Sequence, residues 1–178
     1  MKKSIVSLAV LLSLVGCANN GYPKYAKNYK YVDALKANGL TNADKINNAS
    51  AEIVSFHDPV IKDETDYQSM HIIKNSEEAA NFKTLLKDEQ AFGDLDQIPY
   101  EQVNYFVSGA LSNSSSAYSY VFKGLYIKNN TVYAHLEHDD REEKGVGVSM
   151  DMKYQYCHFT LDKSVSFTDA KLIVSYYE

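Results

Sequence analysis

The chain has 178 residues, enough for one domain with a hydrophobic core of its own. It carries 23 acidic residues against 18 basic ones, a formal net charge of −5, and Arg141 is its only arginine. This balance argues against a nucleic-acid-binding protein, which needs a basic surface. The 15 tyrosines and 7 phenylalanines, without a tryptophan, favour strands over long helices.

The first residues resemble the signal peptide of a bacterial lipoprotein. Lys2 and Lys3 precede an apolar run, residues 5–15, which is shorter than the roughly 20 residues that span a bilayer. The sequence Leu-Val-Gly-Cys that follows ends at Cys17 and resembles a lipobox. We therefore predict that residues 1–16 are removed and that Cys17 carries a diacylglycerol. An ordinary cleaved signal peptide, or a buried helix that ends in cysteine, is the alternative.

Residues 17–31 are predicted to be a lipidated tether, because lysines and tyrosines alternate there and Pro23 breaks any early helix. A flexible segment of this length spans roughly 20 Å. Its lysines can bind anionic headgroups, whereas its tyrosines can bind a partner or pack on the domain. The lipoprotein resemblance, with Ala18 after the cysteine, implies a lipid-anchored protein of the cell envelope and favours the outer over the inner membrane.

Residues 32–178 are predicted to form a single domain that begins with short elements. Residues 32–48 allow one or two short helices, with Gly39 ending the first and Thr41 starting the second. Strands are expected at 52–56 and 67–73. The clearest helix spans about 75–87, because Asn75 can cap it, Glu78 completes a capping-box-like pair and apolar residues share one face.

The last part of the chain is predicted to be mostly strand, with Asn129-Asn130 as a tight turn. The expected strands are 102–111, 118–127, 131–138, 146–159 and 172–177. The fold class is therefore α+β. We expect a mainly antiparallel sheet, or a partly closed barrel or sandwich, with the helix at about 75–87 packed on it.

Residues 70–170 resemble the C-terminal domain of PrcB-type proteins, a family of bacterial lipoproteins named for an accessory subunit of a surface protease complex. The resembling segments are 72–78, which opens a helix, a strand that ends at Gly109, the serine-rich stretch 114–120, the hairpin 127–131, and 150–154 before a last strand. Ala117-Tyr118 replaces the Gly-Tyr pair of that family. The resemblance implies a non-catalytic module that stabilises or docks onto another envelope protein, with no catalytic residues to carry over.

A candidate metal site lies in the region from His135 to Glu143. Imidazole and carboxylate groups that converge bind metals, and His135, Glu137, His138 and Asp139 are the candidate ligands. On a strand, however, His135 and Glu137 share one face while His138 points to the other. A solvated charged turn is the alternative, and no cofactor is predicted.

Nucleophilic catalysis has weak support in this sequence. If Cys17 carries a lipid, Cys157 has no partner for a disulfide, and we predict a buried structural thiol, with a reactive or intermolecular thiol as the alternative. Cys157 and His158 are neighbours on a strand, so they face apart and form no dyad. The serines at 112 and 114–116 lie in no Gly-x-Ser-x-Gly elbow.

These patterns predict a non-enzymatic envelope lipoprotein whose domain binds another protein, as a stabiliser, inhibitor or assembly factor, with Tyr118 and Tyr120 as candidate contact residues. The alternative is a lipoprotein that binds a small ligand or a metal through the His135–Glu143 region. A hydrolase with paired carboxylates is the third hypothesis, since only a fold shows which acids converge.

Overall fold

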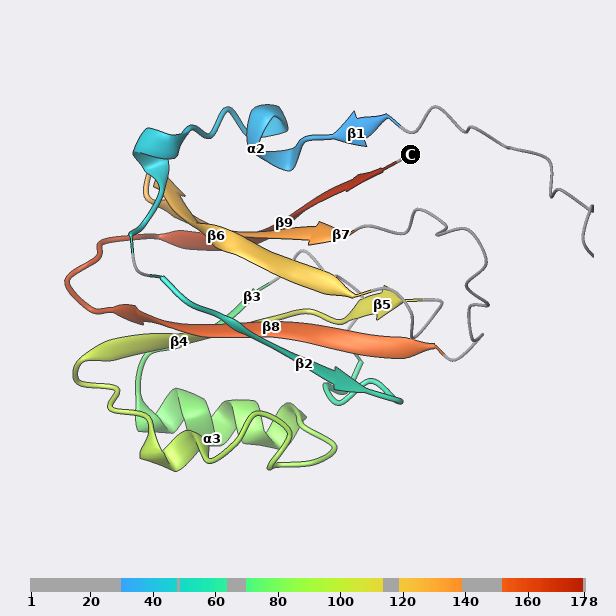
Figure 1. The fold of residues 1–178 in the computed structure, drawn as a ribbon. Coiled ribbons are helices and arrows are strands. Elements are labelled where there is room, and N and C mark those ends of the chain that lie inside the picture. Colours follow the sequence, from blue (N-terminus) through green and yellow to red (C-terminus); the bar gives the residue numbers. More distant parts are fainter. Residues whose placement is uncertain (1–29, 48, 64–69, 114–118, 139–151, 178) are drawn as a thin grey trace, which may run out of the picture.

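The computed structural model describes residues 30–47, 49–63, 70–113, 119–138 and 152–177, which form two stacked β-sheets with helical segments on both outer sides (Figure 1). Sheet I has the strand order β1-β9-β7-β6, and sheet II has the order β2-β8-β4-β3 with β5 also paired to β8. The strands of sheet I are β1 (Tyr31–Val32), β6 (Tyr120–Lys128), β7 (Thr131–His138) and β9 (Asp169–Tyr177). Those of sheet II are β2 (Glu52–Phe56), β3 (Met70–Ile73), β4 (Val103–Ser108), β5 (Leu111–Asn113) and β8 (Lys153–Asp162). The helices are α2 (Ala34–Ala37), α3 (Ser76–Leu85) and the 3-10 helices η1 (Asn42–Asp44) and η2 (Leu95–Gln97).

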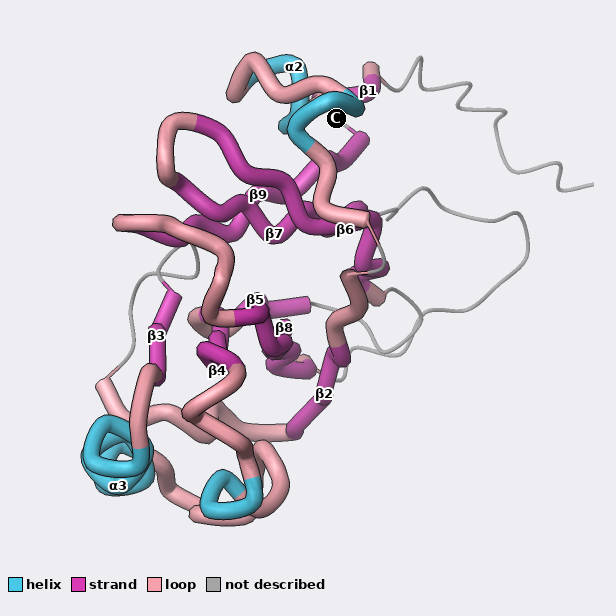
Figure 2. Tube along the Cα trace, turned by 90° about the vertical axis from the view of Figure 1, so that its left-hand side faces the viewer, coloured by secondary structure: helices cyan, strands magenta, loops and turns pink. Residues whose placement is uncertain are grey.

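The α+β class is confirmed, as a sandwich of two sheets rather than a closed barrel. All strand pairs in the described residues are antiparallel except β7 with β9, which run parallel. Figure 2 shows α2 on the outer side of sheet I and α3 on the outer side of sheet II. No helix in the described part of the chain is long and apolar enough to cross a membrane.

Local sequence signals account for the ends of several elements. Asn129 and Asn130 both adopt positive φ, 49° and 58°, and form the two-residue turn between β6 and β7, as predicted. The Asn75 side chain accepts a hydrogen bond from the Glu78 amide at 2.8 Å and caps α3. The Glu78 carboxylate accepts from the Lys74 amide at 2.7 Å, one residue before the position that a standard capping box uses.

The predicted strand 102–111 is interrupted in the structure. β4 ends at Ser108 and β5 begins at Leu111. The Ser108 hydroxyl accepts a hydrogen bond from the Cys157 amide at 2.9 Å and donates to the Gly109 carbonyl at 2.9 Å. The side chain thus satisfies a donor of β8 at the interruption between β4 and β5.

Three buried clusters hold the layers together. The first lies between α3 and sheet II and includes Phe82, Phe92 and Tyr156. The second lies between the sheets and includes Phe106 and Phe159, whose rings stack with centroids 4.7 Å apart. The third is built from Ala34, Leu40, Tyr126 and Ile173, and it attaches the N-terminal segment to the outer face of sheet I.

The described domain begins one residue before the predicted boundary. Tyr31, expected at the end of the tether, belongs to β1 and pairs with Tyr177. Residues 17–29 of the predicted tether lie outside the described residues, as do parts of the strands expected at 67–73, 118–127 and 146–159.

Candidate functional site

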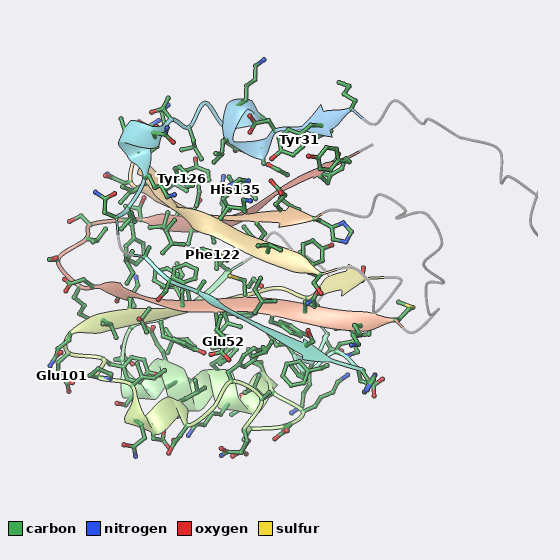
Figure 3. The ribbon with its side chains drawn as sticks, viewed as in Figure 1. Tyr31, Glu52, Glu101, Phe122, Tyr126 and His135 are labelled. Carbon is green, nitrogen blue, oxygen red and sulfur yellow. The ribbon has the colours of Figure 1, made fainter. Side chains whose placement is uncertain are left out.

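The candidate metal ligands on β7 are divided between two faces of sheet I. His135 lies under the N-terminal segment and is only 3 % exposed (Figure 3). Glu137 shares its face, whereas His138 points to the opposite face and stacks on Tyr120 with ring centroids 4.5 Å apart. Asp139 and the charged residues after it lie outside the described residues. The structure therefore does not bring His135 and His138 together.

His135 forms a buried polar group with Ser175 of β9. Its Nε2 lies 2.8 Å from the Ser175 hydroxyl, which also accepts a hydrogen bond from the Ala34 amide at 3.0 Å. Its Nδ1 is buried and has no hydrogen-bond partner among the described residues. Burial lowers the pKa of His135, so the ring is neutral near pH 7. Because Ser175 is fully buried, this Ser-His pair fastens the N-terminal segment and is closed to a substrate.

Glu137 is engaged by two side chains at the edge of this polar group. The Tyr31 hydroxyl donates to its carboxylate at 3.0 Å, and Lys123 Nζ lies 3.5 Å from its other oxygen. Burial, with a further contribution from Glu137, raises the pKa of Tyr31. Glu137 therefore connects β1, β6 and β7.

Cys157 and His158 face opposite sides of sheet II, as predicted. Cys157 is fully buried between the sheets, and burial raises the pKa of its thiol to about 12. The structural role predicted for this thiol agrees with its burial. His158 faces the α3 side, where its Nδ1 lies 2.8 Å from the Tyr105 hydroxyl and its Nε2 lies 3.7 Å from a carboxylate oxygen of Glu52.

The Tyr105–His158–Glu52 series was missed by the sequence reasoning. Burial raises the pKa of Tyr105 and lowers that of His158, so both rings are neutral near pH 7. Glu52 opposes the shift at His158. Only the pairing of β8 with both β2 and β4 brings these residues together, and no local sequence signal marks it.

Of the two tyrosines predicted to bind a partner, the structure describes only Tyr120. Tyr118 lies outside the described residues. Tyr120 is half-buried, with its ring on His138 and its hydroxyl donating to the Ser112 carbonyl at 3.3 Å. Its backbone amide donates to Gln155 at 3.3 Å. Tyr120 thus joins the two sheets, and its role in binding a partner stays a prediction.

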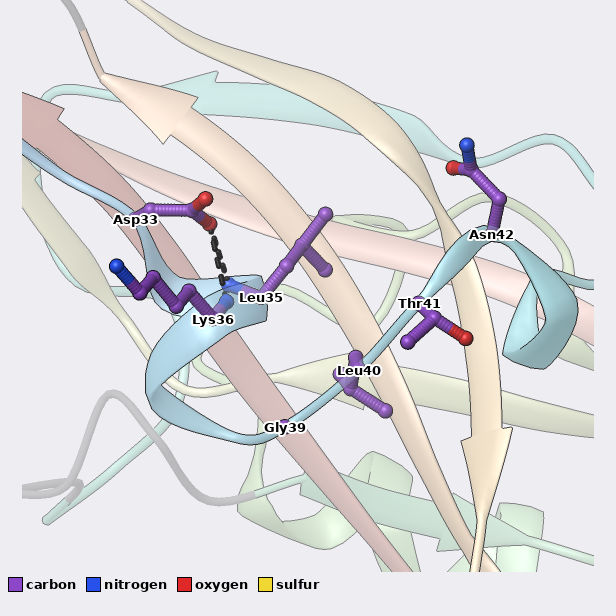
Figure 4. Close-up of a pocket in the computed structure, with 7 residues that line it drawn as sticks. All are labelled: Asp33, Leu35, Lys36, Gly39, Leu40, Thr41 and Asn42. Carbon is purple, nitrogen blue, oxygen red and sulfur yellow. Dashed lines mark hydrogen bonds between the residues drawn. The ribbon is translucent and has the colours of Figure 1, made fainter.

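A shallow surface hollow lies along the N-terminal segment between α2 and η1 (Figure 4). It is lined by Asp33, Leu35, Lys36, Gly39, Leu40, Thr41 and Asn42. The Asp33 carboxylate accepts from the amides of Leu35 and Lys36 at 2.9 and 3.1 Å. The Asp33 carboxylate therefore already caps α2, and the other polar side chains that line the hollow, those of Lys36, Thr41 and Asn42, are exposed.

Most of the exposed large apolar side chains lie at one end of the sandwich. Val121 is 55 % exposed, Met152 52 %, Tyr176 41 % and Tyr31 39 %. All four lie near the end where β1 begins and β9 finishes, whereas Leu85, 41 % exposed, lies on α3. Figure 3 labels Tyr31 at this end, beside the C-terminal strand. We call Tyr31, Val121, Met152 and Tyr176 the apolar end.

The described residues contain no group of three or more His, Cys, Asp or Glu side chains that could hold a metal ion. In comparisons with known proteins, no protein-family model, no curated protein and no solved structure matches this chain.

Proposed function

We propose that this chain is a bacterial envelope lipoprotein, anchored through a diacylglycerol on Cys17, whose α+β domain binds another envelope protein without catalysing a reaction. The anchor is supported by the order of features in the first 17 residues: two lysines, a short apolar run, then Gly16 and Cys17. The resemblance of residues 70–170 to PrcB-type lipoproteins supports the same role.

The proposal that the domain catalyses no reaction is supported by the positions of the reactive side chains in the described residues. Cys157 and Ser175 are fully buried, His135 is nearly so, and each is held between packed elements. The Ser175 hydroxyl and His135 bind each other and the N-terminal segment. These groups contribute to stability, and they do not converge on an accessible cleft.

Strand β2 offers a surface suited to a protein partner. Among the described strands it lies at the edge of sheet II and pairs only with β8, along one of its two edges. An extended segment of a partner can add to such an edge through backbone hydrogen bonds. Edge strands that no further strand covers are the usual place for this kind of recognition.

A photocrosslinking experiment in intact cells tests this proposal. A photoreactive amino acid replaces Glu52 or Phe56 on β2, Tyr118 or Tyr120 near β6, or Lys171 on β9 as a matched exposed control. We expect one adduct of defined mass at the β2 positions, none at Lys171, and loss of the adduct in Cys17→Ser. The purified domain should compete for the same partner.

Two outcomes of the crosslinking experiment would contradict or change this proposal. Equal labelling at β2 and Lys171, or no adduct at any position, would contradict a specific protein partner. An adduct at Tyr118 and Tyr120 alone would keep the function and move its surface from β2 to β6. Mass spectrometry of the mature chain tests the anchor separately, because the proposal requires Cys17 to be the modified first residue.

A further inference from the structure

We infer that the apolar end, made of Tyr31, Val121, Met152 and Tyr176, rests in the headgroup region of the membrane and orients the domain on it. This inference rests on the proposed anchor at Cys17, and it adds a direct lipid contact made by the folded domain itself. The occupant of this surface is therefore a lipid bilayer rather than a protein.

Strand register places these residues at the same end of the sandwich. Tyr120, at the start of β6, pairs with His138, which pairs with Tyr176, and Tyr176 pairs with Val32 beside Tyr31. Val121 pairs with Glu137, to which the Tyr31 hydroxyl donates. Val121 therefore lies opposite Glu137 on the neighbouring strand, and Tyr31 binds the same residue.

Met152 reaches this end from sheet II. Gln155 accepts a hydrogen bond from the Tyr120 amide at 3.3 Å, which aligns β8 with the start of β6. Met152 comes three residues before Gln155, just ahead of β8, and so lies further out along the same direction. The apolar end thus draws one or more residues from each sheet.

The point at which the chain enters the fold favours lipid as the occupant. The described chain enters sheet I at Tyr31, within the apolar end itself (Figure 1). Only thirteen residues separate Tyr31 from Cys17, and a random-coil chain of that length has a root-mean-square span of roughly 20 Å, so the proposed lipid on Cys17 would lie on the side of the apolar end. Tyrosine is enriched at membrane interfaces, where its ring meets acyl chains and its hydroxyl meets water.

Because the chain has no tryptophan, single tryptophans report on each position separately. The variants Val121→Trp, Met152→Trp and Tyr176→Trp are made in the full lipidated chain and reconstituted in vesicles of phosphatidylethanolamine and phosphatidylglycerol. Leu85→Trp is the matched control, since Leu85 is as exposed as Tyr176 but lies on α3. Brominated lipids then quench any tryptophan that contacts the acyl region.

We expect strong quenching and a blue-shifted emission at positions 121, 152 and 176, and neither at position 85. Equal quenching at all four positions, or quenching at 85 alone, would overturn the inference. Absence of quenching at 121, 152 and 176 in vesicles would also overturn it. If the side chains at 121, 152 and 176 were instead shielded from solvent in native envelopes, the occupant of the apolar end would be a protein.

A second measurement separates this inference from the anchor. Vesicle flotation compares the lipidated chain with Cys17→Ser, each with or without the pair Val121→Ser and Tyr176→Ser. If the lipidated chain floats but its tryptophans are not quenched, the anchor stands and the orientation is wrong. We expect the serine pair to lower the vesicle affinity of the Cys17→Ser chain about tenfold, with Leu85→Ser leaving it unchanged; equal affinity in both would contradict the lipid contact.

Discussion

Three buried polar side chains in this domain, Gln155, Ser108 and Ser175, each join two or more elements. Gln155 accepts from the Tyr120 amide and donates to the Ser55 hydroxyl, so one side chain links β8 to both β6 and β2. Ser108 does the same for β4 and β8, and Ser175 for β9 and the N-terminal segment. A buried polar group without a partner costs about 1–3 kcal/mol, so these side chains also define the register of the sandwich.

The buried His135 and the largely buried His158 predict a loss of stability as the pH falls. Burial lowers the folded-state pKa of His135 and His158 below the ordinary value of 6.5. Below about pH 6.5 the unfolded chain therefore binds protons that the folded chain does not, and the free energy of unfolding decreases. Above that pH the two rings make no pH-dependent contribution. The expected slope is at most about 1.4 kcal/mol per pH unit for each histidine.

Urea unfolding midpoints, measured between about pH 7.5 and pH 5, check this prediction. His135→Gln and His158→Gln should each remove part of the slope. His57→Gln is the matched control, because His57 is exposed, and it should leave the slope unchanged. If all three variants keep the full slope, other groups determine the acid sensitivity.

At the scale of elements, β6 depends on a single glycine. Gly124 has a φ of +155° at the point where the register between β6 and β7 shifts, and an added Cβ would lie 2.9 Å from Lys45 Cε. Other residues rarely adopt this backbone conformation, so we expect Gly124→Ala to lower the free energy of unfolding by about 1–3 kcal/mol. Chemical denaturation gives the value.

The double variant Gly124→Ala, Lys45→Ala identifies the cause. Because the lysine side chain is flexible, its contact with the added methyl is cheap to relieve, and the backbone conformation is the main source of strain. Gly124→Ala should therefore lower the free energy of unfolding by about the same amount in the Lys45→Ala background as in the original chain. Full recovery would show that the steric contact dominates.

Elements set by neighbouring residues were predictable from the sequence. Asn75 marks the start of α3 and the Asn129-Asn130 pair marks a hairpin, because each acts on residues within one turn of itself. Gly39, with a φ of 63°, likewise follows α2 where the first helix was expected to end. The break after Ser108 was not marked by any local signal, and the group that Ser108 binds there is the amide of Cys157, 49 residues away.

At the scale of the whole molecule, Ser175 couples the N-terminal segment to sheet I. Ser175→Ala removes the partner of the Ala34 amide and of His135 Nε2, so we expect the free energy of unfolding to fall by about 1–3 kcal/mol. We also expect the Ala34 amide to lose protection against hydrogen exchange through local opening of the N-terminal segment.

Ser108→Ala is the matched control for this coupling. It removes an equally buried serine hydroxyl, but one that binds the Cys157 amide in sheet II. It should lower the free energy of unfolding by a similar amount. The hydrogen-exchange protection of the Ala34 amide should then fall only as far as global stability falls. If both variants affect Ala34 equally, the N-terminal segment has no separate opening.

The candidate sites show where the sequence stops being informative. Strand alternation was sufficient to predict that His135 and His138 face apart, and that Cys157 and His158 do the same. It could not identify the partner of His135, because Ser175 is 40 residues away and meets it only through the parallel pairing of β7 with β9. The residues that make up the apolar end are likewise far apart in the chain.

The position of β9 has a consequence for biosynthesis. β9 lies between β1 and β7, so the first and the third-last strands of the domain meet only through it. Sheet I therefore cannot close until Asp169–Tyr177 has left the ribosome, and every earlier nascent chain lacks a central strand. Such a chain lacks the strand that joins β1 to β7, so we expect sheet I to reach its native pairing only after β9 has been synthesised.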